Sequence, residues 1–206
     1  MPALHYIYDP FCGWCYGAAP LVKAAELIDG IEIQLHAGGM LIGQSCQVVT
    51  PQFRAFVMQH DERIAQMSVQ PFGAAYRDGL LQDATAVFDS EPPTTAILAA
   101  GTRGLKMLQR IQKAHFEEGR RVADESVLFQ LGTDLGFVNF AKAFNAARGS
   151  QTARHIADSR DLLAQVGGEG FPTFVLGDHR LDHAPYLGKA DAWRSHLENT
   201  LTEFAQ

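Results

Sequence analysis

The sequence predicts an α/β fold in which an all-helical segment interrupts a small mixed sheet. Three observations predict it. Strand patterns occur only near the two ends of the 206-residue chain. Helical periodicity alone fills the stretch from about residue 50 to 148. Without that stretch the expected order of elements is β-α-β-α-β-β-α, which builds a small sheet with helices on both faces.

The first part of the chain predicts a β-α-β unit. Aromatic and β-branched residues dominate Ala3–Tyr8, and Asp9-Pro10 ends this strand. An apolar stripe then predicts a helix as far as Ile28, stopped by Asp29-Gly30. Residues 31–36 alternate between apolar and polar and form the second strand. Because a helix connects the two strands, we expect them to be parallel.

The middle of the chain predicts several helices. Thr50-Pro51 is typical of an N-cap followed by proline at the first helical position. Apolar residues then recur at helical spacing, with Asp124 as a further cap and Gly136 as a stop. A block of roughly 100 residues has the size of a domain. We therefore place the sheet-forming domain at residues 1–48 and 150–206, and the helical insertion at 49–149.

Strand patterns return after a helix at residues 152–166. Residues 170–176 are expected to form a strand, and Gly177-Asp178 a hairpin turn into a strand at 180–183. The last helix is expected at residues 190–204. Pro172 lies inside the first of these strands, where it has no N–H to donate. It therefore requires an edge, a bulge or a special peptide geometry.

Composition and charge exclude several classes of protein. The formal net charge is −6, and no basic run marks a nucleic-acid-binding face. No apolar stretch approaches the roughly 18 residues that a membrane span needs. Three cysteines are too few for a secreted disulfide scaffold. The N-terminus lacks a targeting signal. We therefore expect a soluble, cytoplasmic protein, and in that compartment a cysteine pair is usually catalytic or metal-binding.

The strongest motif is Cys12-Gly13-Trp14-Cys15, directly after a strand and at the start of a helix. Free N–H groups of the first helical turn and the helix dipole favour a thiolate at the first cysteine. Two intervening residues let the second sulfur close a disulfide with the first. Half of a zinc site is the alternative, but His179 and His183 lie far outside the usual spacing. His36 and Cys46 are further candidate ligands. We expect no metal.

With these residues the sequence resembles the thioredoxin superfamily, and within it the DsbA-like (FrnE-like) disulfide oxidoreductases. The resemblance rests on residues 9–15, on Gly170-Phe171-Pro172-Thr173 and on the helical segment between them. It covers essentially the whole chain and implies a thioredoxin fold interrupted by a helical insertion. It also implies that Cys12 is the exposed nucleophile and Cys15 the partially buried resolving thiol. Pro172 would be the family's cis-proline, facing both sulfurs. The backbone at Phe171 would then pair with an extended substrate.

One departure from the family concerns proton transfer. Thioredoxin and DsbA carry a buried acid six residues before the first cysteine, and Tyr6 occupies that position here. Asp9 either assists proton transfer for Cys15 or serves as a turn residue. Glu26 shares a helix face with Cys15, but eleven residues at about 1.5 Å each place it too far away.

The residues between the two cysteines also depart from the family. Gly13 and Trp14 match neither the Gly-Pro of thioredoxin nor the Pro-His of DsbA, so neither reduction potential can be transferred. Trp14 either offers an apolar patch to substrates or packs on the insertion. Cys46 is expected to be a bystander. The phenylalanines of the insertion are expected to form its core, with some lining a groove over the site: Phe53, Phe56, Phe72, Phe88, Phe116, Phe129, Phe140 and Phe144.

These observations favour a thiol–disulfide oxidoreductase or isomerase with a redox-active Cys12–Cys15 disulfide and no bound cofactor. Its substrate would be a protein, a peptide or a low-molecular-weight thiol or disulfide, with glutathione as a candidate co-substrate. The alternative is a glutathione-dependent transferase or isomerase similar to the kappa-class transferases and the chromene-carboxylate isomerases. Those enzymes carry serine at the position of Cys12. A non-catalytic binding or chaperone module is a third hypothesis. The insertion also offers a surface for a homodimer.

Overall fold

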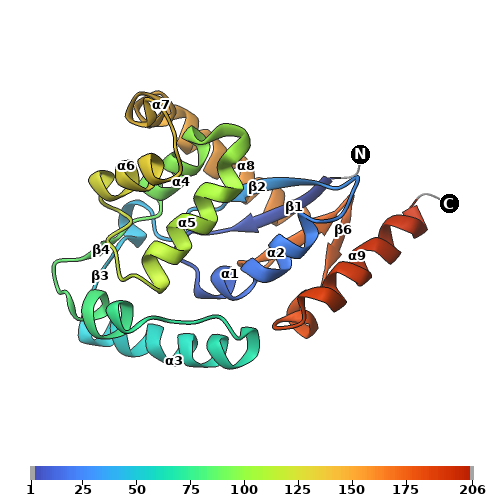
Figure 1. The fold of residues 1–206 in the computed structure, drawn as a ribbon, viewed down its shortest axis with the longest axis horizontal. Helices are drawn as coiled ribbons and strands as arrows, with labels where there is room; N and C mark the ends of the chain where they lie inside the picture. Colours follow the sequence, from blue (N-terminus) through green and yellow to red (C-terminus); the bar gives the residue numbers. More distant parts are fainter. Residues whose placement is uncertain (1–2, 205–206) are drawn as a thin grey trace.

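The computed structural model describes residues 3–204 and contains a four-stranded mixed sheet (Figure 1). The strand order is β2-β1-β5-β6. β1 (Ala3–Tyr8) and β2 (Glu32–Ala37) are parallel, whereas β5 (Thr173–Leu176) is antiparallel to β1. β6 (His179–Leu181) is antiparallel to β5 and completes the sheet. The expected α/β fold with a mixed sheet is therefore confirmed.

The register of the sheet brings three loops to one edge. Tyr8, the last residue of β1, pairs with Ala37 at the end of β2. Ile7 pairs with Thr173, the first residue of β5. The expected strand at 170–176 begins later than predicted, since Pro172 lies just before β5 and therefore needs no ladder hydrogen bond. The motif after β1, the loop after β2 and Pro172 consequently lie at the same end of the sheet.

Four helices accompany the sheet: α1 (Gly13–Gly17), α2 (Ala19–Ala25), α8 (Ser150–Gln165) and α9 (Ala190–Phe204). α2 packs against α9, and α8 packs against β2 (Figure 1). The single helix expected after the motif is divided at Ala18, because Pro20 in the first turn of α2 has no N–H to continue the ladder. α2 also ends before Ile28, where the prediction placed its end.

The insertion is mostly helical. Thr50 caps its first helix as predicted, and the Thr50 hydroxyl accepts a hydrogen bond of 3.1 Å from the Phe53 N–H. The structure differs from the prediction here in one respect: β3 (Gln47–Val48) and β4 (Val87–Phe88), each two residues long, form a short antiparallel pair. Strands of this length are too short to leave a pattern in the sequence. The elements of the insertion are α3 (Pro51–Ser68), η2 (Ala75–Gly79), η3 (Leu80–Gln82), β4, α4 (Glu91–Ala99), η4 (Gly101–Arg103), α5 (Gly104–Phe116), α6 (Glu125–Asp134) and α7 (Phe140–Ala147). The short turn η1 (Gly43–Ser45) and β3 lie just before the insertion, and the short turn η5 (Ala184–Tyr186) lies between β6 and α9.

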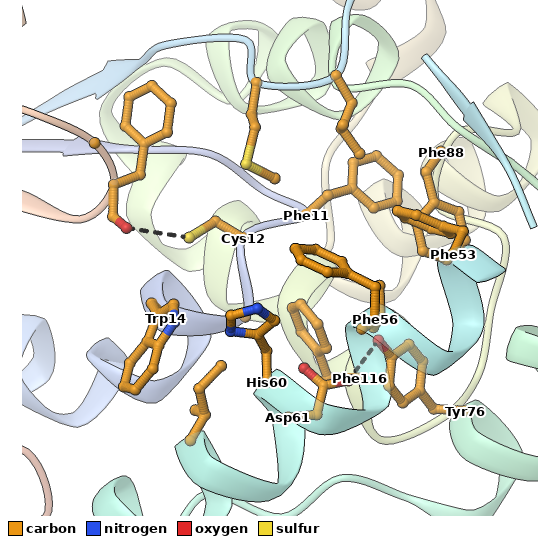
Figure 2. Close-up of a pocket in the computed structure, with 17 residues that line it drawn as sticks. Phe11, Cys12, Trp14, Phe53, Phe56, His60, Asp61, Tyr76, Phe88 and Phe116 are labelled. Atoms are coloured by element: carbon orange, nitrogen blue, oxygen red, sulfur yellow. Dashed lines mark hydrogen bonds between the residues drawn. The ribbon is translucent and has the colours of Figure 1, made fainter. Parts of the chain in front are cut away.

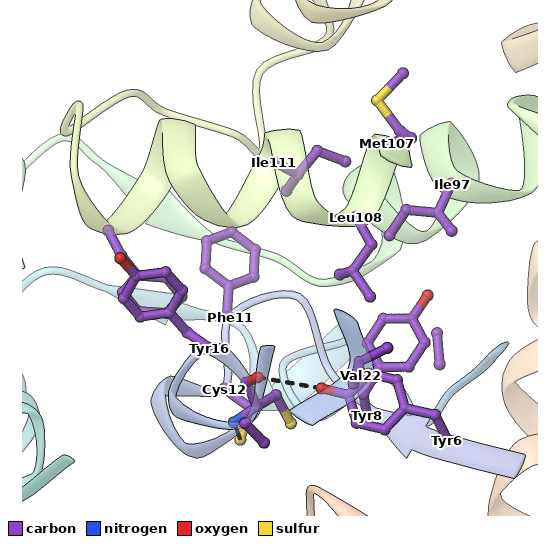
Figure 3. Packing of buried hydrophobic residues seen from close by; sticks show 14 of the residues in the cluster. Tyr6, Tyr8, Phe11, Cys12, Tyr16, Val22, Ile97, Met107, Leu108 and Ile111 are labelled. Atoms are coloured by element: carbon purple, nitrogen blue, oxygen red, sulfur yellow. Dashed lines mark hydrogen bonds between the residues drawn. The ribbon is translucent and has the colours of Figure 1, made fainter. Parts of the chain in front are cut away.

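One apolar core runs from the sheet into the insertion. Figure 3 shows Leu108 of α5 on the side of Tyr6 and Val22 of the sheet-forming part, with Ile111 further along the same helix. All four side chains are buried and belong to one cluster.

Within residues 3–204 no helix is long and apolar enough to cross a membrane.

Two glycines let α3 approach α1 closely. A Cβ atom at Gly13 would lie 2.9 Å from both Asp61 Oδ1 and Ile64 Cδ1. A Cβ atom at Gly17, one turn later, would lie 2.7 Å from Ile64 Cγ2. Real side chains do not pack at these distances. The absence of side chains at positions 13 and 17 therefore sets how near the insertion comes to the cysteine motif.

We expect Gly17→Ala to lower the free energy of unfolding, measured by urea denaturation. Overpacking costs roughly 1–3 kcal/mol, which exceeds the gain of up to about 1 kcal/mol that alanine has over glycine inside a helix. Gly79→Ala is the control, because a Cβ atom there meets open space. In an Ile64→Ala background, Gly17→Ala should cost nothing further. An unchanged stability of Gly17→Ala in the unaltered background would contradict this packing.

Candidate active site

Cys12 and Cys15 lie together at the start of α1. Cys12 is the N-cap residue, and its sulfur accepts a hydrogen bond of 3.3 Å from the Cys15 N–H. Both are free thiols. Cys12 is expected to be exposed and Cys15 to be partially buried, and both expectations are wrong because the insertion covers the motif. Cys12 is only 6% exposed, and Cys15 is completely buried. Burial first, and then the hydrogen bond with Cys12, raise the pKa of Cys15 well above its usual value.

The peptide bond between Phe171 and Pro172 is cis, as expected. The Cys12 thiol donates to the Phe171 carbonyl oxygen at 3.5 Å, the dashed contact at Cys12 in Figure 2. The Phe171 ring lies against Gly38, where a Cβ atom would stand 2.1 Å from Phe171 Cζ. Glycine directly after β2 therefore makes room for the segment that faces Cys12.

Asp9 is completely buried and uses both carboxylate oxygens. Oδ1 accepts hydrogen bonds from the Phe11 N–H and the Ser90 hydroxyl, each at 2.9 Å. Oδ2 accepts one from the Met40 N–H at 2.5 Å. Burial raises the pKa of Asp9, and these hydrogen bonds oppose the rise. The bond to the Phe11 N–H is that of a turn residue, and the other two bonds link Asp9 to two distant segments.

Tyr6 replaces the family's buried acid with a neutral phenol. Its hydroxyl donates to the Cys15 carbonyl oxygen at 3.1 Å, and its ring stacks on Phe174. Burial raises the pKa of Tyr6 well above its usual value, so the phenol keeps its proton. Glu26 is exposed at the C-terminal end of α2.

Cys12 opens onto a pocket of about 480 Å³ (Figure 2). This volume is in the range of small-molecule sites. The insertion supplies much of the wall, with Phe53 and Phe56 from α3, Phe88 from β4 and Phe116 at the end of α5. The expected groove over the site is thus present. The remaining predicted phenylalanines, which do not line it, pack in or against the core: Phe72, Phe129, Phe140 and Phe144.

Trp14 borders the pocket and also contacts the insertion. It is half-buried and lines the pocket, and the Arg63 guanidinium carbon lies 5.7 Å from its ring centroid. The side chain therefore contacts α3 of the insertion and still borders the space over Cys12.

Asp61 is a residue of the pocket that the sequence reasoning missed. It lies on α3 and is 4% exposed, and its Oδ2 accepts a hydrogen bond of 3.0 Å from the Tyr76 hydroxyl (Figure 2). Burial raises the pKa of Asp61 to about 7. A signal existed: Asp61 is four residues after Val57 and three before Ile64, on the apolar face of the helix.

Cys46 lies apart from this chemistry, in the loop between β2 and β3. Its thiol donates to the Leu41 carbonyl oxygen at 3.5 Å, and burial raises its pKa. His36, the other candidate metal ligand, lies on β2, where one of its ring nitrogens is 2.9 Å from a ring nitrogen of His5. In the part of the chain that the structure describes, no group of three or more His, Cys, Asp or Glu residues could hold a metal ion.

Comparisons with known proteins place this geometry in a family. The DSBA-like thioredoxin domain matches residues 4–191. No curated protein matches the sequence. Among solved structures, the cytosolic disulfide reductase DsbM from Pseudomonas aeruginosa, with GSH, is 50% identical, with a TM-score of 0.92 over 97% of this chain and 99% of that chain.

Two solved structures of lower sequence identity are similar to this chain in fold alone. The 2-hydroxychromene-2-carboxylate isomerase is 14% identical, with a TM-score of 0.64 over 99% of this chain and 100% of that chain. DsbA from Pseudomonas aeruginosa is 11% identical, with a TM-score of 0.56 over 99% and 83%. From the family match and the cysteine pair, the chain belongs to the DsbA-like thioredoxin-domain family and is a thiol–disulfide oxidoreductase.

Proposed function

We propose that the chain reduces disulfides, with Cys12 as the nucleophile and Cys15 as the resolving thiol. The observation that carries this proposal is the unequal placement of the two sulfurs. The Cys12 sulfur accepts the Cys15 N–H and borders the pocket, whereas Cys15 is completely buried behind it. A substrate in the pocket can therefore reach only the first sulfur.

The reaction proceeds in two exchanges. The Cys12 thiolate attacks one sulfur of the substrate disulfide, and the second sulfur leaves with the bonding electrons and takes a proton from solvent. A mixed disulfide between Cys12 and the substrate results. Cys15 then loses its proton and attacks the Cys12 sulfur, which releases the second substrate thiol. Two electrons pass to the substrate, and the Cys12–Cys15 disulfide remains.

The raised pKa of Cys15 supports this order of events. Burial and the neighbouring Cys12 keep the Cys15 proton in place while the dithiol is intact. Once Cys12 is bound to substrate, its sulfur carries no charge, and one of the factors that opposed ionisation of Cys15 is gone. Resolution is thereby favoured after the mixed disulfide forms.

Glutathione is the proposed source of electrons for the next cycle. Two glutathione molecules reduce the Cys12–Cys15 disulfide and leave as one oxidised dimer, so that the electrons balance. The likeness to DsbM, a cytosolic disulfide reductase whose structure includes GSH, supports both this donor and a cytoplasmic location.

The neighbouring residues have supporting roles in this proposal. Phe171 and Pro172 offer a backbone edge to an extended protein or peptide substrate, because the Phe171 carbonyl lies 3.5 Å from the Cys12 sulfur. Gly13 admits α3 to the motif, and Trp14 forms a wall of the pocket. Asp9 holds the turn before Cys12.

The alternative, a glutathione-dependent transferase or isomerase, has weaker support. The likeness to 2-hydroxychromene-2-carboxylate isomerase extends to the fold alone. A transferase of that plan needs no resolving cysteine, and Cys15 is present at hydrogen-bond distance from Cys12.

We expect Cys12→Ser to abolish disulfide reduction and Cys15→Ser to accumulate a mixed disulfide between substrate and Cys12. The reason is that the first variant lacks the attacking sulfur and the second lacks the resolving one. Mass spectrometry of the intact protein after incubation with a peptide disulfide checks both. Cys46→Ser is the control and should turn over normally. Turnover that survives Cys12→Ser would favour the transferase alternative.

Equilibration with glutathione buffers should show one reversible two-electron transition. For a reductase we expect a midpoint nearer thioredoxin, at about −270 mV, than DsbA, at about −120 mV. Thiol trapping measures the transition, and Trp14 fluorescence follows it in a Trp193→Phe background. A folded protein that forms no Cys12–Cys15 disulfide in any buffer would contradict the mechanism. A midpoint near that of DsbA would indicate that the protein oxidises thiols and does not reduce disulfides.

Asp9→Ala should destabilise the protein more than Asp9→Asn. Alanine leaves the Phe11 N–H, the Met40 N–H and the Ser90 hydroxyl without an acceptor. Each unpaired buried donor costs roughly 1–3 kcal/mol, whereas asparagine keeps one acceptor oxygen. Urea unfolding gives the two free energies. If Asp9→Asn is as stable as the unaltered protein but loses activity, Asp9 acts in proton transfer instead.

A further inference from the structure

Asp61 lies where the insertion meets the cysteine motif. It is on the face of α3 that packs against α1, and its Oδ1 stands 2.9 Å from where a Cβ atom of Gly13 would be. Its Oδ2 is taken by the Tyr76 hydroxyl. One oxygen is therefore held in place, while the other faces the pocket onto which Cys12 opens (Figure 2).

The pocket around Asp61 is mostly apolar. Among the described residues that line it, Asp61 is the only acid, and none is lysine or arginine. Within residues 3–204 no basic side chain forms a salt bridge with Asp61. A carboxylate buried in such surroundings is costly unless a cation or a hydrogen-bond donor meets it.

Other titratable groups interact with Asp61 or share the pocket with it. Tyr76 and Arg77 lie on η2, Cys12 at the start of α1, and His60 beside it on α3. The Tyr76 hydrogen bond and the Arg77 charge favour the ionised carboxylate, but burial outweighs both. The pKa of Asp61 is about 7, so this carboxyl changes charge near neutral pH.

We propose that Asp61 binds a positively charged nitrogen of the disulfide substrate, so that the pocket selects substrates with an ammonium or guanidinium group on an apolar stem. The stem would lie along Phe56, Val57 and Trp14, and the charge would meet Oδ1 of Asp61. This inference rests on the proposed function of Cys12, since the substrate is held by its sulfur while its charged end reaches α3.

The same geometry disfavours anionic groups in this pocket. An ionised Asp61 repels a carboxylate, and the apolar wall offers no compensating cation. The half of a mixed disulfide that enters the pocket is therefore the cationic one.

A series of chromogenic disulfides tests this selectivity. The probes are 2-pyridyl disulfides of ω-aminoalkanethiols with two to eight carbons, each matched with the ω-hydroxyalkanethiol of equal length. Attack by Cys12 on the alkyl sulfur releases pyridine-2-thione, whose absorbance gives a second-order rate constant, and leaves the alkyl chain on Cys12. The ratio of the amine rate to the hydroxyl rate isolates recognition of the charge, because the reactivity of Cys12 cancels.

We expect this ratio to pass through a maximum at one chain length and to reach about tenfold or more there at pH 8, as for a hydrogen bond between charged groups. Asp61 ionises as the pH rises through about 7, so the ratio should grow between pH 6 and pH 8. The amine stays protonated throughout. This pH profile uses the unaltered protein and does not depend on any variant folding.

In Asp61→Asn the ratio should fall to near one at every chain length and lose its pH dependence. Asparagine keeps an oxygen for Tyr76. Glu62→Gln is the matched control, because it removes an exposed acid from the next position of α3 and should leave the ratio unchanged. A ratio near one in the unaltered protein, or a preference that survives Asp61→Asn, overturns the inference. Thione release that is absent, or equal in Cys12→Ser, overturns the proposed function itself.

Discussion

The carboxylate of Asp9 joins the chain segments that meet at the reactive sulfurs. It accepts the Phe11 N–H just before Cys12, the Met40 N–H beyond β2 and the hydroxyl of Ser90 just before α4. The register of the sheet brings the strand ends near one another, but the loops beyond them need a link of their own. A buried carboxylate can provide it because three donors satisfy its oxygens. The position of Cys12 relative to the insertion depends on this group.

The loop after β2 is held from its other side as well. Arg160 of α8 donates to the carbonyl oxygens of Gly38 and Gly39 at 2.7 and 2.6 Å, and its charge opposes the rise in the pKa of Asp9. The sheet-forming part and the insertion supply different residues to the candidate active site. The sheet-forming part supplies both sulfurs and the cis-proline segment. The insertion supplies much of the apolar wall and Asp61, the residue to which we assign the proposed selectivity for substrates.

Much of the fold and the reactive centre could be predicted because their signals are local. A CxxC motif between a strand and a helix, a capped helix at Thr50, and a Gly-Asp turn each depend on residues within a few positions of one another. The cis-proline and the roles of the two cysteines came from the resemblance to a family. The pair β3 and β4 could not be found in this way, because two-residue strands about 40 residues apart show no periodic pattern.

The sequence by itself determined the order of the four strands of the main sheet, the helical character of the segment between them, the family and the cysteine pair, since backbone hydrogen bonding and side-chain periodicity act over short distances. Only the tertiary structure decided how much of Cys12 is exposed, what Asp9 binds and that Asp61 borders the pocket. Asp9 and Ser90 are 81 residues apart. Burial and charge at the site come from side chains that meet only when α3 packs on the motif. Glycine at positions 13 and 17 permits that contact, but a glycine in the sequence does not show which helix will pack against it.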